Sequence, residues 1–200
     1  MDIEVQEEKP DSQEEETPEK KPKNLFREFL EMVIYVIGVA LAAFFLYHYV
    51  VQQVEVDGHS MMDTLDHGEH LILEKISYRF GDPKRFDIIV FRPYEDEKTT
   101  YYIKRIIGLP GETVQIVDSD IYIDGELLEE DYGSQPIEDP GLAEEPVTLG
   151  KDEYFVLGDN RNNSMDSRDE RVENVKRDAI MGRAWVRMWP LNKIGVLSHK

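Results

Sequence analysis

The chain has 200 residues, of which 40% are hydrophobic and 32% are charged, and its formal net charge at pH 7 is −19. This length suits one globular domain with an additional segment, and the negative charge argues against a nucleic-acid partner because no basic patch is evident to meet a phosphate backbone. Because the chain has no cysteine, disulfides, thiolate nucleophiles and cysteine-bound zinc are excluded.

The first 24 residues are acidic, contain proline and have almost no apolar side chains. A segment of this composition cannot bury enough apolar surface to offset the entropy of ordering its chain. We therefore expect a disordered acidic tail over residues 1–24, and the sequence assigns no specific role to it.

Residues 29–51 form a long apolar run, with no charged residue between Met32 and Tyr47. A helix needs about 20 apolar residues to cross roughly 30 Å of hydrocarbon, and no small-residue cleavage site closes this run. The sequence therefore predicts one transmembrane helix with a basic flank over residues 25–51, rather than a cleaved signal peptide or a buried core helix.

Basic residues lie mainly on one side of this run, since none follows it before Lys75. The basic flank comprises Lys20, Lys21, Lys23 and Arg27. The positive-inside rule places such a flank in the cytoplasm. We expect a single-pass protein of the cytoplasmic membrane, with a cytoplasmic N-terminus and an extracytoplasmic domain over residues 52–200.

This third part contains short segments rich in β-branched and aromatic residues, separated by turn signals such as Asp-Gly and Pro-Gly. The pattern predicts an all-β, mostly antiparallel fold of the sandwich or barrel type. Residues 126–150 are acidic and rich in proline and glycine, which indicates a surface excursion between strands. The expected strands are 69–75, 86–92, 100–108, 112–117, 120–125, 153–159 and 180–189.

If this domain is a hydrolase, the absence of cysteine leaves serine or threonine as nucleophile, and either needs a base. Ser60 follows the apolar run closely, but neighbouring side chains in an extended chain face opposite ways, so His59 cannot easily take its proton. His67 and His70 form a possible pair of metal ligands, yet Gly68 interrupts any helix there and no third ligand has motif spacing. We therefore expect neither a histidine triad nor a metal or other cofactor.

Lysine can act as a base when burial lowers its pKa from about 10.4. In the segment TYYIKRIIG, strand alternation places Tyr102, Lys104 and Ile106 on one face and Arg105 on the other. Arginine does not deprotonate in proteins, so Lys104 is the candidate base. The strand alone leaves open that Lys104 merely extends its amine from a strand edge into water.

A third cluster, GDNRNNSMDSR, covers residues 158–168 and follows an apolar strand. Its asparagine, aspartate and serine residues are typical of a hydrogen-bonded turn with a structural role only. Alternatively, a serine hydroxyl in it orients the lysine amine, while Asp166 and Arg168 pair to hold the loop.

Taken in order, these segments resemble the boxes of the bacterial type I signal peptidases, which are membrane-bound Ser–Lys endopeptidases, and more closely their Gram-positive members. GHSMMDTL resembles the nucleophile box and RFDIIVFR the strand after it, while YYIKRIIGLPGE resembles the lysine box. YFVLGDNRNNSMDSR and GRAWVRMWPLNKIG resemble the last box and the closing strand. The match extends from the apolar run almost to the C-terminus and implies the complex β-fold of that family.

The resemblance implies that Ser60 is the nucleophile, Lys104 the general base, and Ser164 a hydrogen-bond partner that orients the lysine amine. It further implies that Asp166 and Arg168 stabilise the site and that the backbone N–H of Ser60 stabilises the oxyanion. We assign the apolar subsites for substrate to Met61, Tyr102 and Ile103, because these residues neighbour the two reacting groups.

The chain departs from the family pattern at three places. Gly58 stands where some members have a serine that supplies a second oxyanion donor. Asp63 replaces the usual proline and places a charge near an apolar cleft, and DSRDERVENV lacks an aromatic-glycine pair found in many members after the last box.

The implied partners are the lipid bilayer and preproteins whose signal peptides end in small residues, in an Ala-x-Ala pattern. A related self-cleaving repressor peptidase also uses serine and lysine, but it is cytosolic, which the apolar run argues against. An inactive membrane-anchored binding protein with the same fold is the alternative from another functional class, and the intact set of site residues argues against it.

Overall fold

The computed structural model of the chain describes residues 24–93 and 101–197. Except for Asn24, the predicted acidic tail lies outside the described residues. The chain divides into two units, residues 1–42 and 43–200. Helix α1 spans Leu25–Tyr49, and its segment Leu25–Phe45 is the one candidate membrane span among the described residues, by length and composition. Its 21 residues correspond to about 32 Å of helix.

The second unit is built mostly from antiparallel strands. Its larger sheet has eight strands, seven of them in the order β1-β2-β11-β3-β4-β9-β10, with β12 paired to β11. Strand β1 is therefore an edge strand, whereas β3 and β4 lie in the middle. These strands are β1 (Val51–Glu55), β2 (His70–Glu74), β3 (Ile88–Phe91), β4 (Tyr102–Gly108), β9 (Glu153–Leu157), β10 (Val175–Lys176), β11 (Ile180–Trp189) and β12 (Gly195–Val196).

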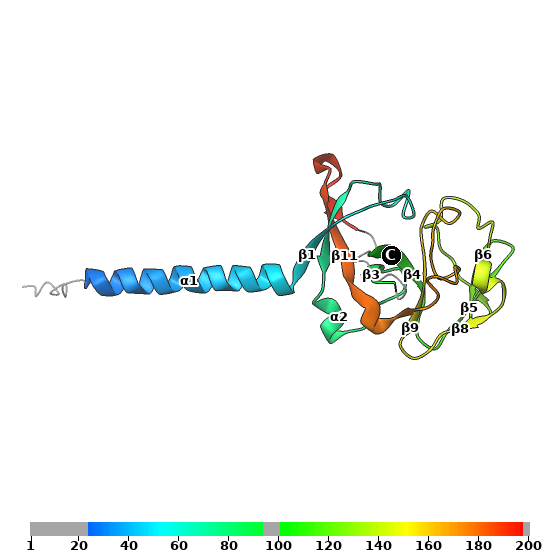
Figure 1. The fold of residues 1–200 in the computed structure, drawn as a ribbon, viewed down its shortest axis with the longest axis horizontal. Helices are drawn as coiled ribbons and strands as arrows, with labels where there is room; N and C mark the ends of the chain where they lie inside the picture. Colours follow the sequence, from blue (N-terminus) through cyan, green and yellow to red (C-terminus); the bar gives the residue numbers. More distant parts are fainter. Residues whose placement is uncertain (1–23, 94–100, 198–200) are drawn as a thin grey trace, which may run out of the picture. The chain divides into compact units, whose positions relative to one another are not determined.

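A smaller sheet has four strands in the order β7-β6-β5-β8. Two tight turns connect β5 to β6 and β6 to β7, and both central residues of each turn have positive φ, as in hairpin turns of type I′. In Figure 1 this sheet lies on the far side of β9 from β1. Its strands are β5 (Thr113–Val117), β6 (Asp120–Ile123), β7 (Glu126–Leu127) and β8 (Val147–Thr148).

Short helices complete the described elements: α2 (Ser77–Phe80) and the 3-10 turns η1 (Gly141–Glu144), η2 (Arg177–Ala179) and η3 (Leu191–Lys193). The apolar core has three clusters. One joins the two sheets and includes Ile107, Val114 and Phe155, and the next lies around Ile89 and Val156. The remaining cluster lies beneath the segment that follows β1.

The predicted all-β, mostly antiparallel fold is confirmed, since every strand pair among the described residues is antiparallel. Each of the seven expected strands contains an observed strand. Two details add to these expectations. The end of the apolar run already belongs to β1, which begins at Val51, and the expected surface excursion over 126–150 supplies β7 and β8 to the smaller sheet.

Candidate active site

Ser60 lies in a turn that leaves the edge strand β1. The chain changes direction at Gly58, whose φ of +104° strongly favours glycine. Directly after Ser60, the side chain of Met61 is buried in the core cluster beneath the turn, together with Leu65. The buried side chains of Met61 and Leu65 hold the turn against the sheet, and the side chain of Ser60 lines a cavity.

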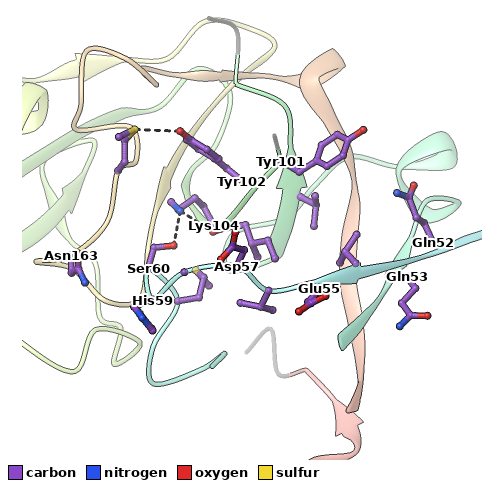
Figure 2. Close-up of a pocket in the computed structure, with 17 residues that line it drawn as sticks. Gln52, Gln53, Glu55, Asp57, His59, Ser60, Tyr101, Tyr102, Lys104 and Asn163 are labelled. Atoms are coloured by element: carbon purple, nitrogen blue, oxygen red, sulfur yellow. Dashed lines mark hydrogen bonds between the residues drawn. The ribbon is translucent and has the colours of Figure 1, made fainter. Parts of the chain in front are cut away.

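Lys104 lies in the middle of β4 and is only 4% exposed. Its Nζ lies 2.8 Å from Ser60 Oγ and donates a second hydrogen bond, of 3.1 Å, to the carbonyl of Ile103. Figure 2 shows the two side chains pointing toward each other from β4 and the turn after β1. The fold thus brings together two groups that are 44 residues apart in the sequence.

The surroundings of Lys104 disfavour its charged form. Burial lowers the pKa of Lys104 from 10.5 to about 8, while the carboxylates of Asp166 and Asp159 act in the opposite direction. With a pKa of about 8, roughly a tenth of the amines are neutral at pH 7, compared with far less than 1% for an ordinary lysine. The pair therefore has an acceptor for the serine proton at neutral pH.

The loop after β9 contacts the nucleophile segment and is held by hydrogen bonds to a buried carboxylate. The N–H of Gly158 donates to Asp166 Oδ2 at 3.0 Å, and the fully buried Asp166 pairs with Arg168 Nε at 2.8 Å. The N–H of Asn160 donates to the backbone carbonyl of Ser60 at 3.0 Å. Asp166 and Arg168 pair as expected. They thus stabilise the loop whose Asn160 contacts the backbone of Ser60.

Ser164 lies in the same loop but does not hydrogen-bond Lys104. Its Oγ is buried and has no hydrogen-bond partner among the described residues. It lies beside Gly158, where an added Cβ would be 2.2 Å from Ser164 Oγ and 2.4 Å from the carbonyl oxygen of Ser60. The hydrogen bond expected between Ser164 and the lysine amine is therefore not formed here, and its role in orienting that amine stays a prediction.

A buried ionic network lies on the other face of β4 and was missed by sequence reasoning. Arg105 is 1% exposed and binds Asp159 through two hydrogen bonds of 2.9 and 2.7 Å, while Thr64 Oγ1 donates to the same carboxylate at 2.5 Å. The ring of Tyr132 lies 3.7 Å from the Arg105 guanidinium. A charged residue within an otherwise buried strand needs a partner, so Arg105 in its apolar segment was the one signal from which the network could have been predicted.

A cavity of about 640 Å³ opens beside the pair. One wall is formed by residues 52–61, and the opposite wall by Tyr101, Tyr102 and Ile103 at the start of β4. The hydroxyl of Tyr102 contacts the sulfur of Met165 at 3.4 Å. All three residues assigned to substrate subsites line the cavity, although Met61 is only 2% exposed and forms part of its floor.

The remaining residues singled out from the sequence are His67 and His70, considered as metal ligands, and Asp63. His67 Nδ1 accepts the N–H of Gly58 at 3.3 Å, and His70 contacts Gln53, so each histidine has its own partner. The described residues contain no group of three or more side chains suited to hold a metal ion. Asp63 is exposed and does not line the cavity, so its charge is not placed in the cleft as the sequence suggested.

Comparison with known proteins adds independent information. A family model described as signal peptidase, peptidase S26, matches residues 27–189. The chain is 38% identical over 187 residues to a probable signal peptidase I-2 of Synechocystis sp., with 92% of this chain and 84% of that protein covered. It is 46% identical over 149 residues to a signal peptidase I of Leptolyngbya laminosa, with 72% and 71% covered. A signal peptidase I crystal structure from Enterococcus faecalis is 35% identical and covers 52% of this chain and 97% of its own, with a TM-score of 0.43.

Proposed function

Because the chain belongs to the signal peptidase family, peptidase S26, we propose that it removes N-terminal signal peptides from secreted preproteins with Ser60 as nucleophile and Lys104 as general base. The observation that carries this assignment is the 2.8 Å contact between the serine hydroxyl and a buried lysine amine. A nucleophile and a base within hydrogen-bond distance are the geometric requirement for covalent catalysis.

The reaction follows from this pair. The neutral amine of Lys104 takes the Ser60 proton while Ser60 Oγ attacks the carbonyl carbon of the scissile bond. The backbone N–H of Ser60 stabilises the resulting oxyanion. The ammonium of Lys104 then protonates the leaving amine, and a water molecule deprotonated by the same lysine releases the signal peptide from Ser60.

The backbone at Gly58 bears on how the oxyanion is stabilised. The positive φ of Gly58 strains any residue with a side chain, so a serine at this position would not supply a second oxyanion donor without backbone strain.

Asp166 and Arg168 act as supporting residues through the loop that contacts Ser60. In this proposal the buried hydroxyl of Ser164, which has no hydrogen-bond partner among the described residues, orients the lysine amine.

The proposed substrate carries small residues at the first and third positions before the cut, in an Ala-x-Ala pattern. Tyr102 and Ile103 form the wall of the cavity next to Lys104, and the buried Met61 closes its floor. A cavity bounded by large side chains beside the nucleophile favours small substrate side chains.

Helix α1 acts as the membrane anchor in this proposal, with its basic flank in the cytoplasm and the β domain outside. Tethering enzyme and membrane-embedded substrate to one bilayer raises their effective concentration. Large apolar side chains at the end of β11 and beyond are also exposed and are proposed to rest on the bilayer surface. They are Trp185, Met188, Trp189, Leu191, Ile194 and Val196.

The test is cleavage of a preprotein by the purified full-length protein in detergent. We expect Ser60→Ala and Lys104→Ala each to lower cleavage by at least about 10³-fold, because each removes a reacting group. Ser134→Ala and Lys151→Ala change the same residue types at exposed positions away from the cavity and should cleave like the wild type.

Thermal unfolding of each variant separates loss of a reacting group from loss of the fold. Wild-type cleavage by either Ser60→Ala or Lys104→Ala would disprove the assignment. A wild-type protein that cleaves no preprotein would instead favour the inactive binding protein.

A further inference from the structure

The proposed function leaves open which residues the substrate carries between its small side chains. Strand β1 has one sheet partner, β2, among the described residues, so its other edge has backbone groups available for pairing. This edge belongs to the wall of the cavity that leads to Ser60. An extended peptide that pairs with such an edge continues the sheet, and its side chains alternate between the two faces.

The two faces of β1 differ in chemistry. Val54 and Val56 pack with the core cluster beneath the nucleophile turn. The N–H of Val56 continues the pairing with the carbonyl of Glu69 at 2.9 Å, so the chain stays extended beyond the end of β1. By strand alternation, Glu55 and Asp57 face away from this core.

Glu55 and Asp57 are both exposed, and the Asp57 side chain is 96% accessible. Figure 2 shows both along the stretch of chain that leads to Ser60. They are the only carboxylates among the described residues that line the cavity. Asp57 lies 3.5 Å from His67 Nδ1, and the same nitrogen accepts the N–H of Gly58 at 3.3 Å.

The positive charges near the cavity do not cancel these carboxylates. Lys104 is buried on the core side of the site, and burial lowers its pKa to about 8. Arg92 contacts the hydroxyl of Tyr101 at 3.5 Å on the opposite wall and does not itself line the cavity.

We propose that Glu55 and Asp57 make this enzyme prefer signal peptides with a basic side chain at the second or fourth position before the cut. This inference rests on the proposed function. Small side chains at the first and third positions face the core side of the cavity, so those at the second and fourth face Glu55 and Asp57. Lysine or arginine there meets an opposite charge, whereas glutamate or aspartate is repelled.

The experiment uses full-length protein in detergent and three peptides that differ only at the second and fourth positions, which are both Lys, both Gln or both Glu. We expect kcat/KM to fall in that order, by about two- to fivefold at each step, as exposed charge pairs allow. The differences should shrink in 0.5 M salt, because salt screens exposed charges.

Charge reversal provides the decisive variant. Glu55→Lys combined with Asp57→Lys should invert the order of the three peptides, and Glu55→Gln with Asp57→Asn should remove it. The matched control is Glu126→Lys with Glu129→Lys, which makes the same change in charge at exposed positions outside the cavity and should keep the order.

Equal cleavage of the three peptides at low salt, or an order that survives charge reversal, would overturn this inference alone. Absence of cleavage of all three would overturn the proposed function and this inference with it.

Discussion

Among single residues, Lys104 has the environment that matters most for the proposed chemistry. Water surrounds an ordinary lysine and keeps it charged, whereas this amine is buried within β4 beside a serine hydroxyl. Burial lowers the pKa of Lys104 to about 8, and the carboxylates of Asp166 and Asp159 limit the decrease. Burial destabilises the charged form, and the two carboxylates oppose this effect.

This pKa predicts how activity depends on pH. Deprotonation increases as pH rises, so kcat/KM should increase about tenfold per pH unit below pH 8 and level off above it. Initial rates with a peptide substrate between pH 6 and pH 10 measure the profile. Lys104→Arg should stay inactive throughout, because arginine does not deprotonate. An unchanged rate between pH 6 and pH 8 would contradict a lysine base.

At the scale of elements, the end of β9 is packed too tightly to accept a side chain. A Cβ at Gly158 would lie 2.4 Å from the backbone carbonyl oxygen of Ser60, which cannot move without moving the nucleophile. We expect Gly158→Ala to lower kcat/KM at least about 100-fold, since small displacements of reacting groups have such effects. Gly195→Ala is the control, because no atom lies within 4 Å of its added Cβ. Normal activity of Gly158→Ala would contradict this prediction, because it would mean that the loop accommodates the added Cβ without displacing Ser60.

A second prediction at this scale concerns the ion pair that joins β4 to the loop after β9. Asp159 and Arg105 are each about 1% exposed, so replacing one leaves a buried charge without its partner. We expect Asp159→Asn to lower the free energy of unfolding by about 3–5 kcal/mol, measured by chemical denaturation. Arg171→Gln removes an exposed ion pair with Asp169 and should cost much less. Equal losses in the two variants would refute the structural importance of the buried pair.

At the scale of the whole molecule, an apolar helix and a β domain with an open cavity are joined in one chain. The candidate span of 21 residues is long enough to cross a bilayer. The basic residues before it, with no Lys or Arg after it until Lys75, set the proposed orientation. In the proposed function, a membrane-bound substrate and the anchored enzyme meet at this membrane surface.

The absence of cysteine makes this orientation easy to test. Ser12→Cys lies before the helix and Ser134→Cys in the β domain, so each variant carries a single thiol. In intact cells we expect a membrane-impermeant maleimide to label Ser134→Cys and not Ser12→Cys, and to label both after detergent treatment. Labelling of Ser12→Cys alone in intact cells would reverse the proposed orientation.

The sequence by itself determined the features that depend on neighbouring residues. Apolar length predicted α1, segments rich in β-branched and aromatic residues predicted seven of the strands, and Asp-Gly indicated the turn after β6, because these propensities act over a few residues. The resemblance of ordered motifs singled out Ser60 and Lys104. Besides β1, the two-residue strands β7, β8, β10 and β12 escaped prediction, because their pairing depends on strands elsewhere in the chain.

Only the tertiary structure decided which distant groups meet. The fold places the turn after β1 beside β4, so that Ser60 meets Lys104. Because both faces of β4 are buried, Arg105 pairs with Asp159. Ser164, placed next to the lysine amine by its motif, instead has a buried hydroxyl without a partner. These outcomes depend on packing summed over the whole sheet and on which staggered rotamer each side chain adopts, neither of which a local sequence pattern contains.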